Sequence, residues 1–189
     1  MAWKTAKYKL TGDAPLMMHN GQLANPLNSF AKRLKQVSSK RKKTDADYEE
    51  MAHIEFLGGL YINGKGPYLP AYNIQKTIIN GARKVNEGKI AESSMYCGAD
   101  APLEYDGPKD AEGLWKEEDF RSCLLVKVKQ ARIVRTRPIF ADWGCTVELM
   151  YDAEQINESQ LDRWMDLAGT TVGICEQRPT LGRFSAEKV

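Results

Sequence analysis

The sequence predicts an α+β fold with a four-stranded antiparallel sheet and two core helices, the arrangement of ferredoxin-like domains. Polar and apolar residues alternate near both ends of the chain and over residues 123–137. Two segments between these stretches carry apolar residues at helical spacing. The resulting order is strand, helix, strand, strand, helix, strand, which is the split βαβ arrangement. Because a sheet seldom leaves both faces bare, we expect insertions at about 12–60 and 87–120 to cover the second face, unless a ligand does.

Four segments carry the pattern of strands. Residues 3–10 alternate and end at the turn residues 11–13. Residues 123–137 give the strongest strand signal, with a shift of phase at Gln130–Ala131 that indicates a bulge. Residues 145–151 follow a turn at 138–144, and residues 183–189 make the last strand.

Two segments carry the pattern of core helices. The first follows Pro70, with Asn73 as the expected cap and Ile74, Ile78, Ala82 and Val85 on one face. The second opens at about residue 159. Its expected core face comprises Leu161, Trp164, Met165, Ala168 and Val172.

The first insertion contains the signals of two further helices. Asn25 and Pro26 predict a basic helix over 27–38, and Thr44 with Asp47 predicts a capped helix over 45–57. An Asn63–Gly64 turn predicts a short hairpin. Residues 88–115 are polar and rich in turns, with one short strand expected near 102–105.

Length and composition favour a cytoplasmic protein with one domain, residues 1–189. The chain has 189 residues, of which 42% are hydrophobic and 28% charged. It has no apolar run long enough to span a bilayer and no signal sequence, so we expect no membrane association. Four widely spaced cysteines and two histidines form no metal-ligand spacing, and no nucleotide or hydrolase motif is present. No metal or cofactor is expected.

Charge is segregated although the net charge is only +2. Two segments are basic and free of acids, whereas acids gather at 45–55 and 104–119. Nucleic acid is one explanation, and a contact between basic and acidic patches of neighbouring protomers is another. The basic residues of the two segments are Lys32, Arg33, Lys35, Lys40, Arg41, Lys42 and Lys43, then Lys127, Lys129, Arg132, Arg135 and Arg137.

A loop with two glycines and two arginines joins the second core helix to the last strand. Gly173 and Gly182 permit close backbone approach to another chain or a phosphate, and Arg178 and Arg183 match phosphate geometry. A tight turn with solvated arginines is the alternative.

This loop, residues 68–76 and residues 80–83 together resemble the repeat-associated mystery protein superfamily, the RNA-binding subunits of CRISPR complexes. The resemblance covers the core and not the insertions. The loop has fewer glycines than the family often has, and the chain is short for a CRISPR backbone subunit. A stand-alone relative, for example from a phage, is therefore an equal alternative.

The resemblance implies an RNA-recognition-like fold and non-catalytic binding of single-stranded RNA or DNA, with a homo-oligomer that grows along its ligand. Lys76 and Arg83 would lie on a helix beside the loop. Tyr8, Tyr68, Tyr72 and Phe140 could stack on bases, although for each a role in the core is the more common one, since Tyr and Phe usually fill cores.

Two alternative functions remain. His19 follows the first strand, near where metal-independent ribonucleases of the same superfamily place a catalytic histidine. It could deprotonate a ribose 2′-hydroxyl, with Lys76 or Arg183 stabilising the phosphate. Alternatively, the charged patches could meet between protomers of a structural or assembly protein that binds no nucleic acid.

Overall fold

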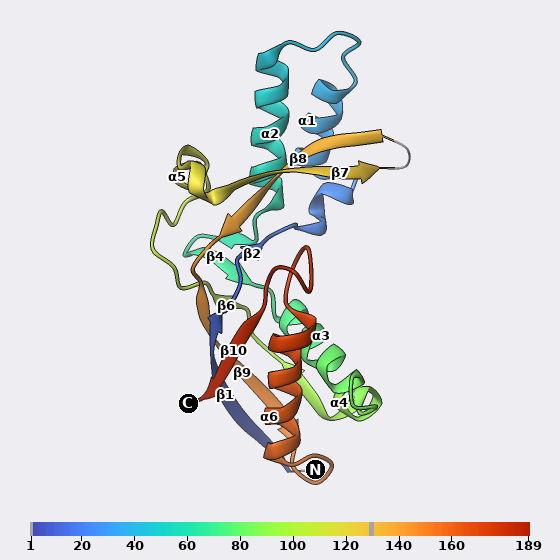
Figure 1. The fold of residues 1–189 in the computed structure, drawn as a ribbon, viewed down its shortest axis with the longest axis vertical. Coiled ribbons are helices and arrows are strands. Elements are labelled where there is room, and N and C mark those ends of the chain that lie inside the picture. Colours follow the sequence, from blue (N-terminus) through green and yellow to red (C-terminus); the bar gives the residue numbers. More distant parts are fainter. Residues whose placement is uncertain (1, 129–130) are drawn as a thin grey trace. The chain divides into compact units, whose positions relative to one another are not determined.

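The computed structural model describes residues 2–128 and 131–189, which form an α+β fold with antiparallel sheets (Figure 1). The helices are α1 (Ser29–Ser38), α2 (Asp45–Gly59), α3 (Ala71–Arg83), α4 (Gly88–Ser94), α5 (Ala111–Lys116), α6 (Glu158–Leu167) and the shorter η1 (Gly21–Ala24), η2 (Glu118–Phe120) and η3 (Ala168–Val172). The strands are β1 (Trp3–Gly12), β2 (Leu16–Met17), β3 (Ile62–Asn63), β4 (Gly66–Leu69), β5 (Met95–Cys97), β6 (Ala101–Pro102), β7 (Arg121–Val128), β8 (Ala131–Phe140), β9 (Gly144–Asp152) and β10 (Phe184–Lys188).

The chain divides into two compact units. The first unit contains the residues up to Leu16, Pro67–Asp106 and Ala141–Val189, and the second contains Met17–Gly66 and Gly107–Phe140. Both ends of the chain thus belong to the first unit. The expectation of one domain over 1–189 stays a prediction.

A four-stranded antiparallel sheet forms the centre of the first unit. Its strand order is β10-β1-β9-β5, with Tyr8 of β1 opposite Val147 of β9 and Lys188 of β10. Alternate residues of β1, among them Ala6 and Leu10, are buried, so one face of the sheet lies in the core. The two-residue pairing of β4 with β6 belongs to the same unit.

The strand predicted over 123–137 is wrong in two respects. These residues make two strands, β7 and β8, that pair with each other in the second unit, with Leu125 opposite Val134. The polar and apolar alternation continues through both strands, so periodicity alone could not reveal that they are separate. The bulge expected at Gln130–Ala131 involves Gln130, which lies outside the described residues.

The fourth strand of the sheet is instead β5, which pairs with β9 through Met95, Tyr96 and Cys97. Three residues are too few to carry a recognisable alternation, and they lie in a segment expected to be irregular. The expected short strand near 102–105 is β6, at Ala101–Pro102.

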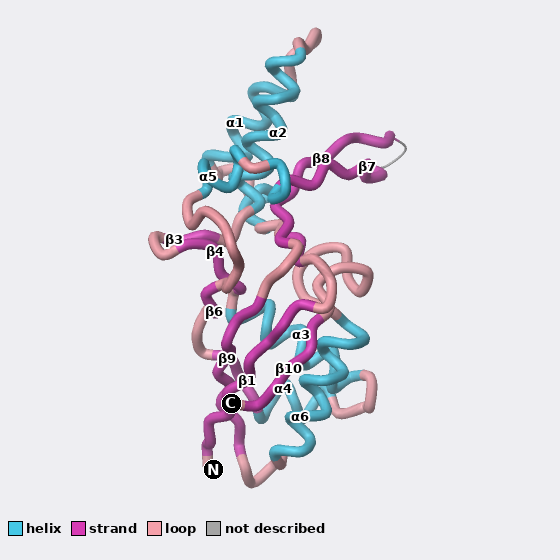
Figure 2. Tube along the Cα trace, turned by 60° about the vertical axis from the view of Figure 1, so that its left-hand side comes forward, coloured by secondary structure: helices cyan, strands magenta, loops and turns pink. Residues whose placement is uncertain are grey.

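Helices α3 and α6 lie side by side on the same side of the sheet (Figures 1 and 2). Their buried faces include Ile74, Ile78 and Ala82 of α3, as predicted, and Leu161, Trp164 and Met165 of α6. The start of α3 differs from the expectation, because Pro70 occupies the N-cap position and makes no side-chain cap. Asn73 lies within the helix, and its side-chain amide contacts Sγ of Cys175 at 3.9 Å.

Gly81 is the point at which the backbones of α3 and α6 cross. A Cβ atom at this position would collide with the carbonyl oxygen of Trp164 and would lie 2.8 Å from the backbone nitrogen of Ala168. Both neighbours are main-chain atoms, which cannot move aside as a flexible side chain can. The close approach of the two helices therefore requires glycine here.

The second unit contains the helical pair α1 and α2 and the strands β7 and β8. The capping box predicted for α2 is confirmed, since Thr44 and Asp47 exchange side-chain to backbone hydrogen bonds. Helix α1 begins at Ser29 with Asn28 as its cap, two residues later than predicted. Glu55 of α2 is buried, pairs with Arg135 of β8 and accepts a hydrogen bond from the Thr136 amide, which fixes the helix to the strand.

We predict that Gly81→Ala destabilises the protein by about 1–3 kcal/mol, the cost of inserting a methyl group into a packed contact. Helix propensity alone would favour alanine by about 1 kcal/mol, so a net loss isolates the effect of the helix crossing. Chemical denaturation measures the change. Gly64→Ala is the control, because a Cβ atom there meets nothing within 4 Å. A stabilised Gly81→Ala protein would contradict the packing.

Candidate nucleic-acid interface

The segment from Gly173 to Gly182 is a closed loop held by its own backbone. The amide of Ile174 donates to the carbonyl of Gly182 at 2.8 Å, and the amide of Leu181 donates to Gln177 at 3.0 Å. The amides of Gly173 and Gly182 donate to Ala168 and Pro15, each at 2.8 Å. Both glycine amides are thus engaged within the protein, which leaves neither with a free donor for a phosphate.

The fold itself requires glycine at positions 173 and 182. From the sequence alone, this requirement could not be distinguished from a role in ligand contact. Gly173 and Gly182 have φ angles of +74° and +71°, in the left-handed region. A Cβ atom on Gly173 would lie 2.8 Å from the carbonyl oxygen of Leu181, and one on Gly182 would collide with Ile174. They bring the two ends of the loop together.

The two arginines of the loop have different roles. Arg183 donates from Nε to the carbonyl oxygen of Pro179 at 2.8 Å and so braces the loop, although its side chain is exposed. Arg178 is exposed between the two glycines. The loop therefore presents Arg178 to solvent on a braced backbone.

The start of α3 is tied to this loop by the contact between Asn73 and Cys175. Loss of hydration raises the pKa of the Cys175 thiol to about 12, so the thiol stays protonated at neutral pH. It acts as a packing group and not as a reactive one.

An open pocket of about 590 Å³ brings Arg178 together with the end of α3. Its lining contains three cationic side chains, those of Arg83, Lys84 and Arg178, and none of its lining residues is acidic. Asn80 and Thr171 supply further polar groups. The pocket is lined by Asn80, Arg83, Lys84, Thr171, Val172, Arg178 and Pro179. Two residues that the sequence singled out, Arg83 and Arg178, therefore meet at one site.

Lys76 and Arg83 also share an acidic neighbour that the sequence did not indicate. Oε1 of Glu92, on α4, lies 2.8 Å from Nη2 of Arg83 and 3.8 Å from Nζ of Lys76. Glu92 falls in a segment expected to be irregular, so only the folding of α4 reveals this contact. Lys84 and Asn80 were likewise missed, although Lys84 follows Arg83 directly in the sequence.

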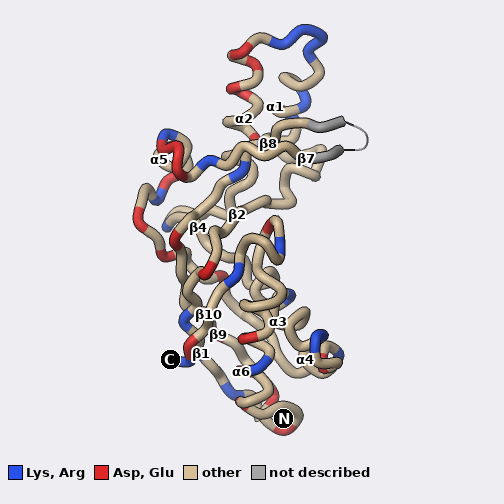
Figure 3. The backbone as a smooth tube through the Cα atoms, viewed as in Figure 1, with Lys and Arg blue, Asp and Glu red and all other residues tan. Residues whose placement is uncertain are grey.

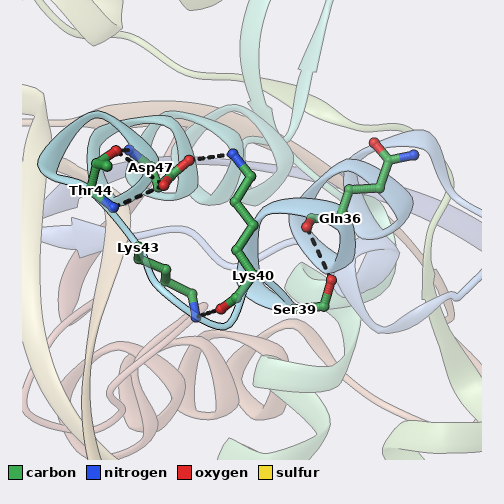
Figure 4. Close-up of polar contacts among 6 residues, drawn as sticks. All are labelled: Gln36, Ser39, Lys40, Lys43, Thr44 and Asp47. Atoms are coloured by element: carbon green, nitrogen blue, oxygen red, sulfur yellow. Dashed lines mark hydrogen bonds and ion pairs between the residues drawn. The ribbon is translucent and has the colours of Figure 1, made fainter.

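A second basic surface lies in the second unit, where the connector from Ser39 to Lys43 joins α1 to α2 (Figure 3). Lys40 pairs with Asp47, and Nζ of Lys43 donates to the carbonyl oxygen of Lys40 at 3.0 Å (Figure 4). Arg41 and Lys42 are exposed, as are Lys32 and Arg33 of α1. Among the described residues, the ion pairs of this surface include Lys40 but none of those four side chains.

The Lys40–Asp47 pair holds the connector between α1 and α2 in place. The hydrogen bond from Lys40, followed by that from the Thr44 amide, lowers the pKa of Asp47 to about 2. The same bond raises the pKa of Lys40. Asp47 thus ties the connector to the first turn of α2, where a negative charge also favours the helix dipole.

Arg135 and Arg137 of β8 line a pocket of about 270 Å³ together with His19. His19, Arg135, Arg137 and Glu55 line this pocket, together with Leu23, Ala24, Leu34 and Thr136. Since Arg135 pairs with the buried Glu55, its first role is structural. Lys127, Lys129 and Arg132 of the same basic segment lie outside the residues whose side chains are described.

Of the four aromatic residues considered for base stacking, two are excluded by burial. Tyr8 and Phe140 are 2% and 0% exposed. The hydroxyl of Tyr8 donates to Oδ1 of Asp162 at 2.5 Å, and burial raises the pKa of that hydroxyl. Tyr72, in the first turn of α3, is 63% exposed and is the aromatic side chain of this set most accessible to a base.

We predict that Asp47 supports stability above about pH 4 and loses this effect as the pH falls through about 2, because its pKa is depressed in the folded state from an unfolded value of about 3.9. Asp47→Asn should therefore destabilise the protein near neutral pH and match the parent in strong acid. Urea denaturation across this range measures the difference. Asp45→Asn removes an equal charge from the same turn and should have a smaller effect. A difference that does not vary with pH would contradict the ion pair.

Within the described part of the chain, no helix is long and apolar enough to cross a membrane, and no group of three or more His, Cys, Asp or Glu side chains is arranged so that it could hold a metal ion. Comparison with protein-family models and with curated proteins gives no match for this chain.

Proposed function

We propose that the protein binds single-stranded nucleic acid without cleaving it and forms homo-oligomers along its ligand in the cytoplasm. The observation that carries this proposal is the acid-free pocket at which Arg83, Lys84 and Arg178 meet. Three cations from two separate segments, in a pocket whose lining residues include no acid, suit the closely spaced phosphates of one strand.

We further propose that the first unit is ferredoxin-like and related to the repeat-associated mystery protein superfamily. The order β1, α3, β5, β9, α6, β10 and the sheet order β10-β1-β9-β5 support the ferredoxin-like arrangement. The resemblance of residues 68–76, 80–83 and 173–184 supports the relationship. In this fold the loop before the last strand and the first core helix lie near each other, as Arg178 and Arg83 do.

In the proposed mechanism, the strand is held through its phosphates. Arg178 forms charge-assisted hydrogen bonds from the braced loop, and Arg83 and Lys84 neutralise neighbouring phosphates. These contacts carry no sequence information, so binding would be general and strongly dependent on salt. Tyr72 would add stacking, worth about 1–3 kcal/mol for each base stacked.

The second unit would supply an independent electrostatic contact. Its exposed cations, Lys32, Arg33, Arg41 and Lys42, stand on α1 and on the connector that Asp47 orders. A flexible connector would lose more entropy on binding than one that is already tied down. The affinity of the second unit for nucleic acid should therefore depend in part on the Lys40–Asp47 pair.

We predict that Arg178→Ala weakens binding of single-stranded oligonucleotides and makes the dependence of log K on log salt less steep, by about 0.7 for each phosphate that the variant no longer neutralises. Fluorescence anisotropy at several salt concentrations gives both quantities. Arg163→Ala, on the exposed face of α6 and outside the pocket, removes the same charge from the same unit and should leave both nearly unchanged. Equal effects of the two substitutions would contradict the site.

A metal-independent endoribonuclease is the second candidate, because His19 shares its pocket with Arg135 and Arg137. In such a reaction, His19 would accept the proton of the 2′-hydroxyl while an arginine stabilised the phosphorane. Arg135 pairs with the buried Glu55, and Arg137 lines the same pocket as His19. Lys76 and Arg183, the partners considered from the sequence, belong to the other unit.

Incubation of the protein with labelled RNA in excess chelator separates the two candidates. The leading proposal predicts that the RNA is bound and stays intact. Cleavage that disappears in His19→Ala, while binding persists, would replace the leading proposal with the second candidate. Cleavage that survives His19→Ala would contradict the role of His19.

A further inference from the structure

Arg83 lines a second open pocket in the first unit, which extends the candidate site beyond the loop. This pocket has a volume of about 550 Å³ and is lined by Arg83, Asn86, Gly88, Lys89 and Glu92. Arg83 is therefore a lining residue of both pockets. Unlike the lining of the first pocket, that of the second pocket contains an acid, Glu92.

The position of Arg83 between the two pockets is set by its neighbours. Nη1 of Arg83 donates to Oδ1 of Asn80 at 3.0 Å, and Nη2 donates to Oε1 of Glu92 at 2.8 Å. A Cβ atom at Gly88 would collide with the Arg83 side chain, so glycine at the start of α4 leaves room for it. The guanidinium is thus held in place before any ligand arrives.

The contact with Glu92 is one that a ligand can exchange. The side chains of Arg83 and Glu92 are each 48% exposed, and that of Lys76 is 56% exposed. Exposed ion pairs are weak and screened by salt, so they open readily. Glu55, whose side chain is only 8% exposed in its pair with Arg135, is the contrasting case of a buried structural acid.

We propose that the carboxylate of Glu92 occupies the position of a ligand phosphate and is displaced when nucleic acid binds. The inference rests on the proposed function, which it extends to a second phosphate subsite. In the bound state a phosphate oxygen takes over the hydrogen bond from Arg83 and the charge of Lys76. Lys89, which lines the same pocket, neutralises the next phosphate. Glu92 leaves toward solvent on the exposed face of α4.

This arrangement makes Glu92 an internal competitor that lowers affinity. Only a ligand that supplies more than one phosphate can replace Glu92 and fill the first pocket at the same time. A lone phosphate ion or mononucleotide should then bind poorly, which favours a polymer over the abundant small phosphates of a cell. Removal of the competing charge should tighten binding of the polymer.

The test is the affinity of Glu92→Gln for a labelled single-stranded oligonucleotide at low salt. We expect binding about two- to five-fold tighter than that of the parent, the size expected when an exposed ion pair is removed. Glu187→Gln removes the same charge from an exposed position on β10, outside both pockets, and measures the general effect of one charge. Thermal melting confirms that both variants are folded.

Introducing Glu92→Gln into the Lys76→Ala/Arg83→Ala variant completes a mutant cycle, which measures how far the effect of Glu92 depends on these two cations. The gain from Glu92→Gln should fall there to that of Glu187→Gln, because the cations with which Glu92 competes are gone. Equal gains from Glu92→Gln and Glu187→Gln in the parent background, with Arg178→Ala still weakening binding, would overturn the competitor and leave the proposed function intact. Absence of single-strand binding by the parent itself would overturn both.

Discussion

The first unit depends on the close crossing of α3 and α6 at Gly81. There the backbone of one helix approaches that of the other so closely that no side chain fits between them. Arg83 follows Gly81 by two residues, and η3 and the loop with Arg178 follow α6 directly. The crossing therefore fixes the distance between the two segments that carry the cations. Gly173 and Gly182 then close the loop, so that Arg178 projects from a braced backbone.

Several basic side chains of the protein pair with an acid, and the burial of that acid determines the role of the pair. Glu55 is buried and holds Arg135, which makes that pair part of the architecture. Asp47 is nearly buried and ties Lys40 to α2, which orders a connector on which Arg41 and Lys42 face solvent. Glu92 is half exposed against Arg83 and Lys76, which makes it exchangeable. A basic side chain beside an acid can thus be part of the architecture, order a connector or form an exchangeable contact, depending on burial.

The sequence predicts the elements whose signals are local and long enough to repeat. The capping box of Thr44 and Asp47, the buried faces of α3 and α6, and the strands β1 and β9 belong to this class. The fourth strand of the first unit's sheet shows where such prediction ends. Residues 123–137 were expected there, but β5 occupies the position, because the partner of a strand is a long-range property that alternation does not encode. The same limit applies to the site. Arg178 could be singled out from its glycine-containing loop and Arg83 from the resemblance of residues 80–83. The pocket at which they meet, and Glu92 beside Arg83, exist only in the folded chain.

Fluorescence anisotropy with single-stranded RNA, single-stranded DNA and duplex, each at low and physiological salt, tests the central claim most directly. The account predicts that single strands bind more tightly than duplex and that salt weakens the binding steeply. The tighter of the two single strands would identify the natural ligand. Failure to bind any of the three would contradict the account, and the basic surfaces would then be assigned to contacts between protomers.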